Sequence, residues 1–448
     1  MKATLKILWP ALVIAGGVIL NAGAGVVTLD ECVSTALKAS PDVRAASARL
    51  EAARAAVTEA TSAYYPQIGL AGNWVRTDNP PQAFFMSLNQ RQASLQKDFN
   101  HPGDTENVRS SVTAQWRLYD GGRREADRSV SSLGSLAADY TLASVRNDLA
   151  YQVTRAFYGI LEARDFAKVR EHSLKSLTET LRVASERQRA GSALKSDVLN
   201  TEVALSQVKE DLIRALNGVE LAVAALNTAV GHDMLTLADV ASLPADLPFL
   251  GSTNVIPATV ETRPEWGAVD AQVRQAEAGA ARARREFRPT VSAFGSLDWD
   301  RESFSAGPER SYLAGVAVEL NVFDGFRTRA GVARAAAGVV AARAEADKLR
   351  RALQLDLLQA RLNEREARER LDAAGKTLAS AEESLRITRE RYRQGAADLN
   401  DLMMAEVGWT SVQARHTAAH YDCLMARANV KRAGGESRGA DATSPRQE

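Results

Sequence analysis

The sequence predicts a mainly α-helical chain with a smaller β portion, organised as two copies of one structural plan. Three observations support this fold class: an internal repeat, an apolar heptad seam in each copy, and four segments whose apolar residues alternate. Ala is abundant among the 448 residues and aromatic residues make up only 6%, which favours long helices over a sheet-rich core.

The charge balance and the N-terminal segment indicate a compartment and exclude one class of partner. Lys and Arg total 56 against 55 Asp and Glu, so the chain lacks the basic excess of nucleic-acid-binding proteins. Two lysines precede an apolar run from Ile7 to Leu20, and Ala22 to Ala24 supply the small residues of a cleavage site. We therefore expect residues 1–24 to be a signal peptide that is removed on export. A membrane anchor is the alternative, which this short, proline-containing run does not favour.

An internal repeat organises the remaining chain. Tyr65-Pro66-Gln67-Ile68 matches Arg288-Pro289-Thr290-Val291 at an offset of 223, whereas Asp120-Gly121 matches Asp324-Gly325 at an offset of 204. The change of offset places a deletion of 19 residues in the second copy, between Pro289 and Asp324. Variable length before the Asp-Gly pair is typical of a surface loop, and the fixed length after it is typical of a structural rod.

The stretch of fixed length is predicted to be a long helical hairpin in each copy. From Leu194 to Leu226, apolar and small residues recur in steps of four and three, and Leu402 to Val430 repeat this seam. The segment from Gly122 to Arg189 contains no proline, and about 68 residues at 1.5 Å each would form a helix of about 100 Å. A compact domain cannot contain such a rod, so we expect the hairpins to pack side by side into a wall.

Four segments of about ten residues have the alternating period of β-strands. They are residues 67–74, 108–118, 290–299 and 312–322. Strands of this length can cross an outer membrane at a tilt, but four strands cannot close a barrel in lipid, because an open edge leaves backbone groups without partners. A conducting pore therefore requires at least three chains and twelve strands.

Aromatic residues in these segments suit a membrane interface, although a sandwich core is the plainer interpretation of any one of them. The residues assigned to an aromatic girdle are Trp74, Trp116, Trp299 and Tyr312.

Seven motifs occur in a fixed order along the two copies. They are LDECVSTALKASPDV, YYPQIGL, WRLYDGGRREA and RQRAGSALKSDVLNTE in the first copy, and FRPTVSAFG, NVFDGFRTRA and RYRQGAADLNDLMMAE in the second. Together they resemble the TolC family of outer-membrane efflux ducts from about Leu29 to Gly434. The resemblance implies a homotrimer with a twelve-stranded transmembrane β-barrel and a long α-helical coiled-coil tunnel across the periplasm. It also implies a periplasmic adaptor and an inner-membrane pump as partners.

The repeat and the resemblance divide the chain into five parts. After the signal peptide, residues 25–230 form the first repeat, with a helix, two membrane strands with a loop, and a hairpin. Residues 231–262 link the repeats and are a candidate equatorial belt around the tunnel. Residues 263–433 form the second repeat, and the polar tail at 434–448 has too little apolar content to fold.

Four sites at the junctions between strands and helices are assigned structural roles. Pro66 and Pro289 lie where helical periodicity changes to alternation, since proline disfavours helix at the preceding residue. Asp120 and Asp324 precede the next helix, which a carboxylate can cap, and the glycines that follow them, Gly121 and Gly325, permit the bend.

The hairpin turns are the predicted contact with the adaptor. Gly191 and Gly395 lie at these turns, where glycine accommodates the positive φ that ends a helix. The resemblance implies that the turns form the periplasmic tip, although a tight turn without a partner explains the glycines equally well. The predicted contact residues are Ala190, Gly191, Ser192, Gln394, Gly395 and Ala396.

Charged residues just past the turns are assigned to a gate, because the family has a closed iris lined by charges at this position. Asp197 and Asp401 match in register, and both also fit ordinary first-turn acids that the helix dipole stabilises. The family has an arginine shortly before the second aspartate, but no arginine lies between Ala396 and Asp401 here. The sequence therefore does not identify the ion pairs that hold the tip closed. The four predicted gate residues are Lys195, Asp197, Asp398 and Asp401.

The histidines and cysteines do not indicate catalysis. His416, His420 and Cys423 share a helix face at metal-ligand spacing, but His416 and Cys423 occupy seam positions, which favours packing over a metal site. The chain contains no GxSxG, HExxH or phosphate-binding glycine loop, so we predict neither an enzyme nor a cofactor.

The family places its N- and C-terminal helices near one another, which makes Cys32 and Cys423 a candidate disulfide. Two acids directly before Cys32 disfavour lipidation there.

These patterns favour a passive export duct in the outer membrane that extends into the periplasm and is driven by a separate pump. The alternative is a periplasmic coiled-coil scaffold or adaptor without a membrane barrel. Two alternating strands with a loop in each copy distinguish the two, because a scaffold does not need them. Drugs, metal ions and secreted proteins, including type I secretion cargo, share the same tunnel and are not distinguished by the sequence.

Overall fold

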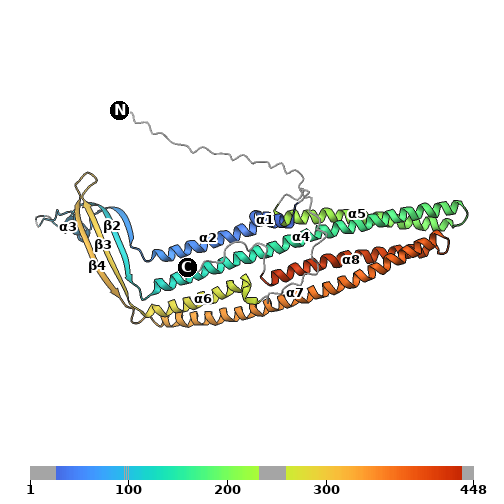
Figure 1. Ribbon diagram of the computed structural model, residues 1–448. Coiled ribbons are helices and arrows are strands. Elements are labelled where there is room, and N and C mark those ends of the chain that lie inside the picture. The colour runs from blue at the N-terminus through green and yellow to red at the C-terminus, as the bar shows by residue number, and fades with distance from the viewer. Residues whose placement is uncertain (1–26, 95, 97, 99, 232–258, 436–448) are drawn as a thin grey trace, which may run out of the picture.

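A computed structural model of the chain describes residues 27–94, 96, 98, 100–231 and 259–435. The predicted signal peptide, most of the linker and most of the polar tail lie outside the described residues. The described part is elongated, with a four-stranded sheet at one end and two helical hairpin tips at the other (Figure 1). Every helix in the described ranges is too short or too polar to span a membrane.

Each repeat has a helix, two strands and two long helices in the same order, and α1 and α3 occur only in the first repeat. The first repeat contains α1 (Leu29–Ala39), α2 (Pro41–Ser62), β1 (Gln67–Thr77), α3 (Pro80–Asn89), β2 (Thr105–Tyr119), α4 (Arg123–Arg189) and α5 (Lys195–Val230). The second contains η1 (Val260–Thr262), α6 (Pro264–Arg284), η2 (Arg285–Phe287), β3 (Thr290–Arg301), β4 (Glu309–Glu319), α7 (Arg327–Arg393) and α8 (Leu399–Ala433).

The helices form a wall in which α4 and α7 run the full length. Both contain 67 residues, about 100 Å at 1.5 Å per residue, as the fixed length of the repeat predicted. The second repeat's α6 and α8 follow one another along α7 and also pack against α4, whereas α2 and α5 pack against the other side of α4. One border of the wall is therefore α2 and α5, and the opposite border is α7 (Figure 1).

The four strands form one antiparallel sheet in the order β1-β2-β3-β4. The central pair, β2 with β3, joins the two repeats, and Val112 pairs with Leu297 in its register. The outer strands β1 and β4 form the two edges. The alternating segments of the sequence are thus confirmed as strands.

Two details of this region differ from the sequence prediction. The strand predicted to reach Val322 ends at Glu319, which pairs with Thr290. The next position of the partner strand, towards α6, is Pro289. The pairing stops there because proline has no N–H to donate. The extra length of the first repeat contains the helix α3, which the sequence analysis missed. Asn79 caps α3 by accepting a hydrogen bond from the Gln82 N–H at 3.4 Å.

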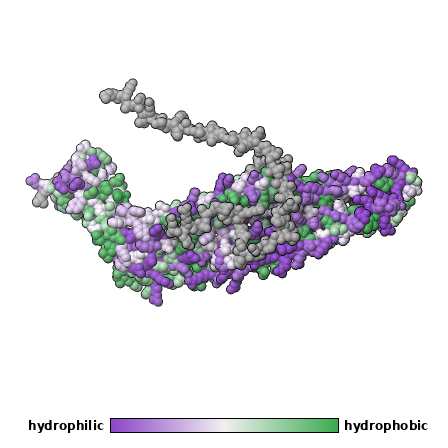
Figure 2. Space-filling view, in the orientation of Figure 1, coloured by the Kyte–Doolittle hydropathy of each residue, from purple (hydrophilic) through white to green (hydrophobic). Residues whose placement is uncertain are grey.

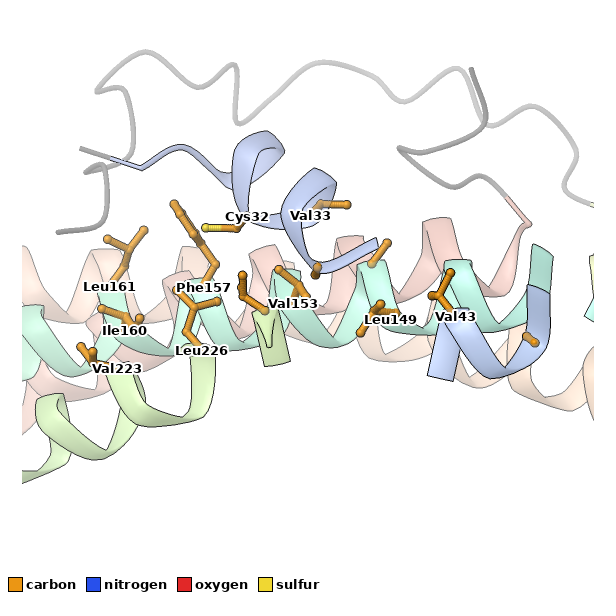
Figure 3. Packing of buried hydrophobic residues seen from close by; sticks show 14 of the residues in the cluster. Cys32, Val33, Val43, Leu149, Val153, Phe157, Ile160, Leu161, Val223 and Leu226 are labelled. Atoms are coloured by element: carbon orange, nitrogen blue, oxygen red, sulfur yellow. The ribbon is translucent and has the colours of Figure 1, made fainter. Parts of the chain in front are cut away.

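The main apolar cluster lies where α1, α4 and α5 meet (Figure 3). Val153 and Ile160 of α4 are fully buried, and Leu226 of α5 is 1% exposed. The capping box of α1 orients this helix: Thr28 Oγ1 accepts from the Glu31 N–H, and Glu31 Oε2 accepts from the Thr28 N–H. Cys32 of α1 consequently packs in the cluster near Phe157 (Figure 3).

Replacing Ile160 by Ala should lower the free energy of unfolding by about 2–5 kcal/mol, because a fully buried side chain leaves a cavity when it is truncated. Chemical unfolding of the detergent-solubilised protein measures the change. The exposed Lys209→Ala on α5 is the control and should leave the transition unchanged. Equal transitions for the two variants would mean that this cluster does not hold the helices together.

Candidate functional site

The junctions between sheet and helices are built as the sequence predicted for capping. Asp120 is 1% exposed, and its carboxylate accepts hydrogen bonds from the backbone N–H groups of Gly122, Arg123 and Arg124 at 2.9–3.1 Å. Asp324 caps α7 in the second repeat through one backbone bond, in which it accepts from the Thr328 N–H at 2.8 Å. Each strand therefore passes into its helix through a fixed turn.

The two repeats are also bonded to each other at these junctions. Arg288, just before Pro289, donates to the Gly121 carbonyl at 2.9 Å, and Arg123 pairs with Glu286 at 3.0 Å. Gly121 has a φ of +74°, and a side chain there would overlap Arg288. Gly325 has a φ of +65° with open space around it, and Pro66 lies exposed between α2 and β1. The junction of one repeat thus fixes the junction of the other.

The register divides the sheet into an apolar and a polar face. Ile68, Leu70 and Trp74 of β1 share one face with the apolar positions of the other strands, which are Val112, Ala114, Trp116, Val291, Ala293, Leu297, Trp299, Tyr312, Val316 and Val318. Several of these side chains are exposed, Leu70 by 83% and Tyr312 by 80%. Apolar side chains gather along the sheet and its junctions, whereas the helical wall is mostly hydrophilic (Figure 2).

The aromatic residues assigned to a girdle all lie on this apolar face. Trp74, Trp299 and Tyr312 lie towards the loops that join the strands, and Trp116 lies towards the helices. The Trp116 indole N–H donates to the Tyr64 carbonyl at 3.0 Å. Trp116 is eight residues from Val108, the partner of Trp74, and this separation is about 26 Å along the strand.

The opposite face of the sheet is mostly polar and contains an ion pair in which the acid is buried and the arginine is partly exposed. Asp300 is 1% exposed, and its Oδ1 accepts from Arg109 Nε at 2.9 Å and from Asn107 Nδ2 at 2.6 Å. Arg109 and Asp300 lie directly opposite each other on β2 and β3. Charge buried in this way is tolerated because it is paired and hydrogen-bonded. Sequence alternation identified the strands but gave no sign of this cluster.

The hairpin tips contain the two predicted glycine turns. Gly191 and Gly395 have φ values of +74° and +79°, and in each turn the residue after the glycine donates its backbone N–H to a carbonyl of the preceding helix. All six predicted contact residues are exposed. The two tips touch, because the Arg187 guanidinium lies 4.8 Å from the centre of the buried Tyr392 ring.

The predicted gate residues lie in the first turns of α5 and α8. Asp197 is half-buried and accepts from the Leu194 N–H at 3.2 Å, whereas Asp401 is exposed. Asp398 caps α8 by accepting from the Asp401 N–H at 2.8 Å, and Lys195 is exposed. Both alternatives of the sequence analysis, a gate and first-turn acids, fit these positions.

A buried polar link between the hairpins is a feature that sequence reasoning missed. Glu406 of α8 is 5% exposed, and its Oε1 accepts from Ser176 Oγ of α4 at 2.7 Å. Arg389 of α7 donates to the same Ser176 Oγ at 2.7 Å. The link joins three helices above the tips, and the only hint in the sequence is a carboxylate beside the apolar seam of α8.

The cysteines and histidines sit in packed surroundings. Cys32 and Cys423 are both buried and free, and burial raises the pKa of each thiol, which keeps both protonated. His416 faces Gly375 of α7, and burial lowers the pKa of His420. The described ranges contain no group of three or more His, Cys, Asp or Glu side chains that could hold a metal ion.

A wall of helices that continues into a sheet with an exposed apolar face is the architecture of a membrane channel subunit. The chain matches the family described as outer membrane efflux protein over residues 32–232 and 255–436. It therefore belongs to this family, whose fold is that of channel proteins. It is an outer-membrane export duct that extends into the periplasm.

The relatives include proteins from several bacteria. Protein CyaE of Bordetella pertussis is 27% identical over 402 residues, which cover 86% of this chain and 79% of that protein. The cobalt-zinc-cadmium resistance protein CzcC of Cupriavidus metallidurans is 27% identical over 225 residues, 49% of this chain and 52% of CzcC. The crystal structure of VceC from Vibrio cholerae has a TM-score of 0.75 at 17% identity and covers 91% of this chain and 96% of VceC, which shows a shared fold.

Replacing Gly395 by Ala should destabilise the second tip by about 1–2 kcal/mol, because an L-residue with a side chain disfavours its φ of +79°. The matched control is Gly408→Ala, a helical position with open space, which should stabilise α8 by about 0.5–1 kcal/mol. Hydrogen exchange of the tip amides reports the local opening free energy. Unchanged exchange at the tip in Gly395→Ala would contradict the turn geometry.

Proposed function

We propose that three copies of the chain close into one tube, with a twelve-stranded barrel in the outer membrane and a helical tunnel in the periplasm. The observation that carries this proposal is that the sheet and the wall are open on the same two sides. In the sheet, β1 and β4 form the edges, and in the wall the borders are α2 with α5 and, opposite, α7. Since β1 continues from α2 and β4 continues into α7, each open side runs the whole length of the chain.

The internal duplication supports a specific way of closing these sides. Within the chain, β2 and α4 of the first repeat pack against β3, α6 and α8 of the second. In the second repeat, β4 and α7 are equivalent to β2 and α4, but among the described residues their outer sides have no neighbour. The elements that would fit there are β1, α2 and α5, because they are equivalent to β3, α6 and α8. The next copy therefore supplies β1, α2 and α5 to β4 and α7, in a head-to-tail contact that closes as a ring.

Exposed apolar side chains along both borders fit this contact. On α7 they are Val340, Leu355, Leu358, Leu362 and Ile387, and on α5 they are Leu199, Val203, Ile213, Leu216 and Leu221. Ile387 is the repeat equivalent of Val183, which packs on α4 against the cluster around Leu402 of α8. By the same equivalence, Ile387 packs against α5 of the next copy.

The two faces of the sheet take opposite roles in this assembly. The apolar face with its aromatic residues faces lipid, and the polar face with the Arg109–Asp300 pair faces the pore. The loops between the strands then lie outside the cell, because they are at the end opposite the helical wall. The hairpin tips reach into the periplasm.

The exposed tips are the proposed contact with a periplasmic adaptor, which joins the duct to an inner-membrane pump. The turns at Gly191 and Gly395 present Ala190, Ser192, Gln394 and Ala396 to the adaptor. Asp197, Asp401, Lys195 and Asp398 line the gate. CzcC is named for cobalt, zinc and cadmium resistance, whereas the name of CyaE specifies no cargo.

Replacing Leu358 by Asp should lower the fraction of trimer, because it places a charge in the apolar stripe that faces the next copy. The matched control is Asn363→Asp, which adds the same charge to an exposed position of α7 away from the stripe. The mass of the detergent-solubilised particle measures the result. A trimer that tolerates Leu358→Asp as well as Asn363→Asp would place the interface elsewhere.

Replacing both Asp197 and Asp401 by Asn should reduce cation selectivity, because three copies confine six carboxylates around one axis. Asn keeps the oxygen that caps the Leu194 N–H, so the helix start is preserved. The reversal potential across planar bilayers measures the effect. The difference from the parent should shrink at 1 M salt, where the Debye length is about 3 Å. An unchanged reversal potential at low salt would mean that these residues only begin their helices.

A further inference from the structure

The helix α3 lies on the polar face of the sheet at its outer end. Ala83 and Ser87 of α3 are buried, and α3 packs against β2 (Figure 1). Gln90, which ends the helix and is 4% exposed, donates from Nε2 to Asn107 Oδ1 at 3.0 Å and to the Glu106 carbonyl at 2.7 Å. Asn107 lies on the same face as Arg109, so the end of α3 is fixed to the polar face rather than the apolar one.

The anchor of α3 continues across three strands. Asn107 donates to the buried Asp300 of β3, which the side chain of Arg109 also holds. Arg91, which follows Gln90, pairs with Glu309 of β4 at 3.3 Å and donates to the Arg310 carbonyl at 3.3 Å. Arg91 has a φ of +55°, which turns the chain back over the sheet. This network holds α3 against the inner wall of the proposed pore.

The free face of α3 carries two large apolar side chains beside the polar Gln82 and Asn89. Phe85 is 63% exposed and Leu88 is 45% exposed, three residues apart and on the side of the helix opposite Ala83, Ser87 and Gln90. This face of the sheet has few large apolar side chains, namely Val75, Phe294 and Leu313, and Phe85 and Leu88 remain exposed within their own chain. A second copy of the same face is the occupant that the symmetry of the assembly supplies.

The dimensions of the bore bring these faces together. Twelve strands spaced about 4.8 Å apart and tilted by about 40° enclose a circle about 24 Å across between backbones. Three helices, each about 10 Å in diameter with its side chains, fill such a circle. Helices anchored to the inner wall of every copy therefore meet near the axis.

We infer that the α3 helices of three copies contact one another through Phe85 and Leu88 and close the outer mouth of the duct. The inference rests on the proposed trimer. Apolar contact at the axis excludes water and polar solutes, while the Gln90–Asn107–Asp300 network keeps each helix at the wall. The chain then has a closure at its outer end in addition to the proposed gate at the periplasmic tips.

Access of a thiol reagent from outside the cell tests this closure without involving the periplasmic gate. Ser111→Cys places a thiol on the polar face of β2, four residues beyond Asn107 towards the helices. The two natural cysteines are buried in the helical wall and can be replaced by Ser. A membrane-impermeant maleimide added to intact cells should label this site slowly in the parent.

Replacing Phe85 and Leu88 by Ser should raise the labelling rate by about tenfold or more, because access follows the open fraction of the closure. Gln90→Leu, which breaks the anchor, should also raise it. The matched control is Phe304→Ser, which removes an exposed aromatic residue from the β3–β4 loop and should leave the rate unchanged. A thiol at Ser305 calibrates reagent access, because it lies in the same outer loop.

Fast labelling of Ser111→Cys in the parent, equal to that at Ser305→Cys, would overturn the closure. An unchanged slow rate in both the Phe85/Leu88 variant and Gln90→Leu would also overturn it. The oligomeric state of each variant is measured alongside by native electrophoresis. A parent protein that is not a trimer would instead contradict the proposed function. Failure of the closure and failure of the proposed trimer are thereby distinguished.

Discussion

Hydrogen bonding at the edges of the sheet is the constraint on which the remaining structure depends. Among the described strands, β1 and β4 each have a neighbour on one side only, and an unpaired edge in lipid leaves every second backbone group unsatisfied. The duplication that creates these two edges also makes them complementary, since β4 is equivalent to β2 and β1 to β3. The proposed closure between copies therefore repeats a contact that already exists inside the chain, both in the sheet and along the helical wall.

The equal lengths of α4 and α7 follow from this repetition. A tube of constant wall height requires the two full-length helices to match, and both contain 67 residues. The loops between the strands face no such requirement, so the first repeat can accommodate α3 where the second has only residues 302–308. The bonds from Arg288 to Gly121 and from Arg123 to Glu286 then hold sheet and wall in one register.

Much of the fold could be predicted from the sequence, because periodicity and repetition are properties of the chain itself. The seam from Leu194, the alternation around Val112 and the caps at Asp120 and Asp324 are local signals, and each was found. The helix α3 was missed although Asn79 followed by two prolines is a helix-start signal. The Glu406–Ser176 link and the Asp300 cluster join residues about 190 to 230 positions apart, and a single sequence contains no local pattern for such pairs.

We propose that the free edges of one copy are closed by the next. The most direct measurement is a structure of the assembled particle in a lipid nanodisc. We expect threefold symmetry, with β1 of each copy hydrogen-bonded to β4 of its neighbour and α5 packed against α7 across the same interface. A particle in which β1 and β4 of one copy pair with each other, or in which either edge is left facing lipid, would contradict it.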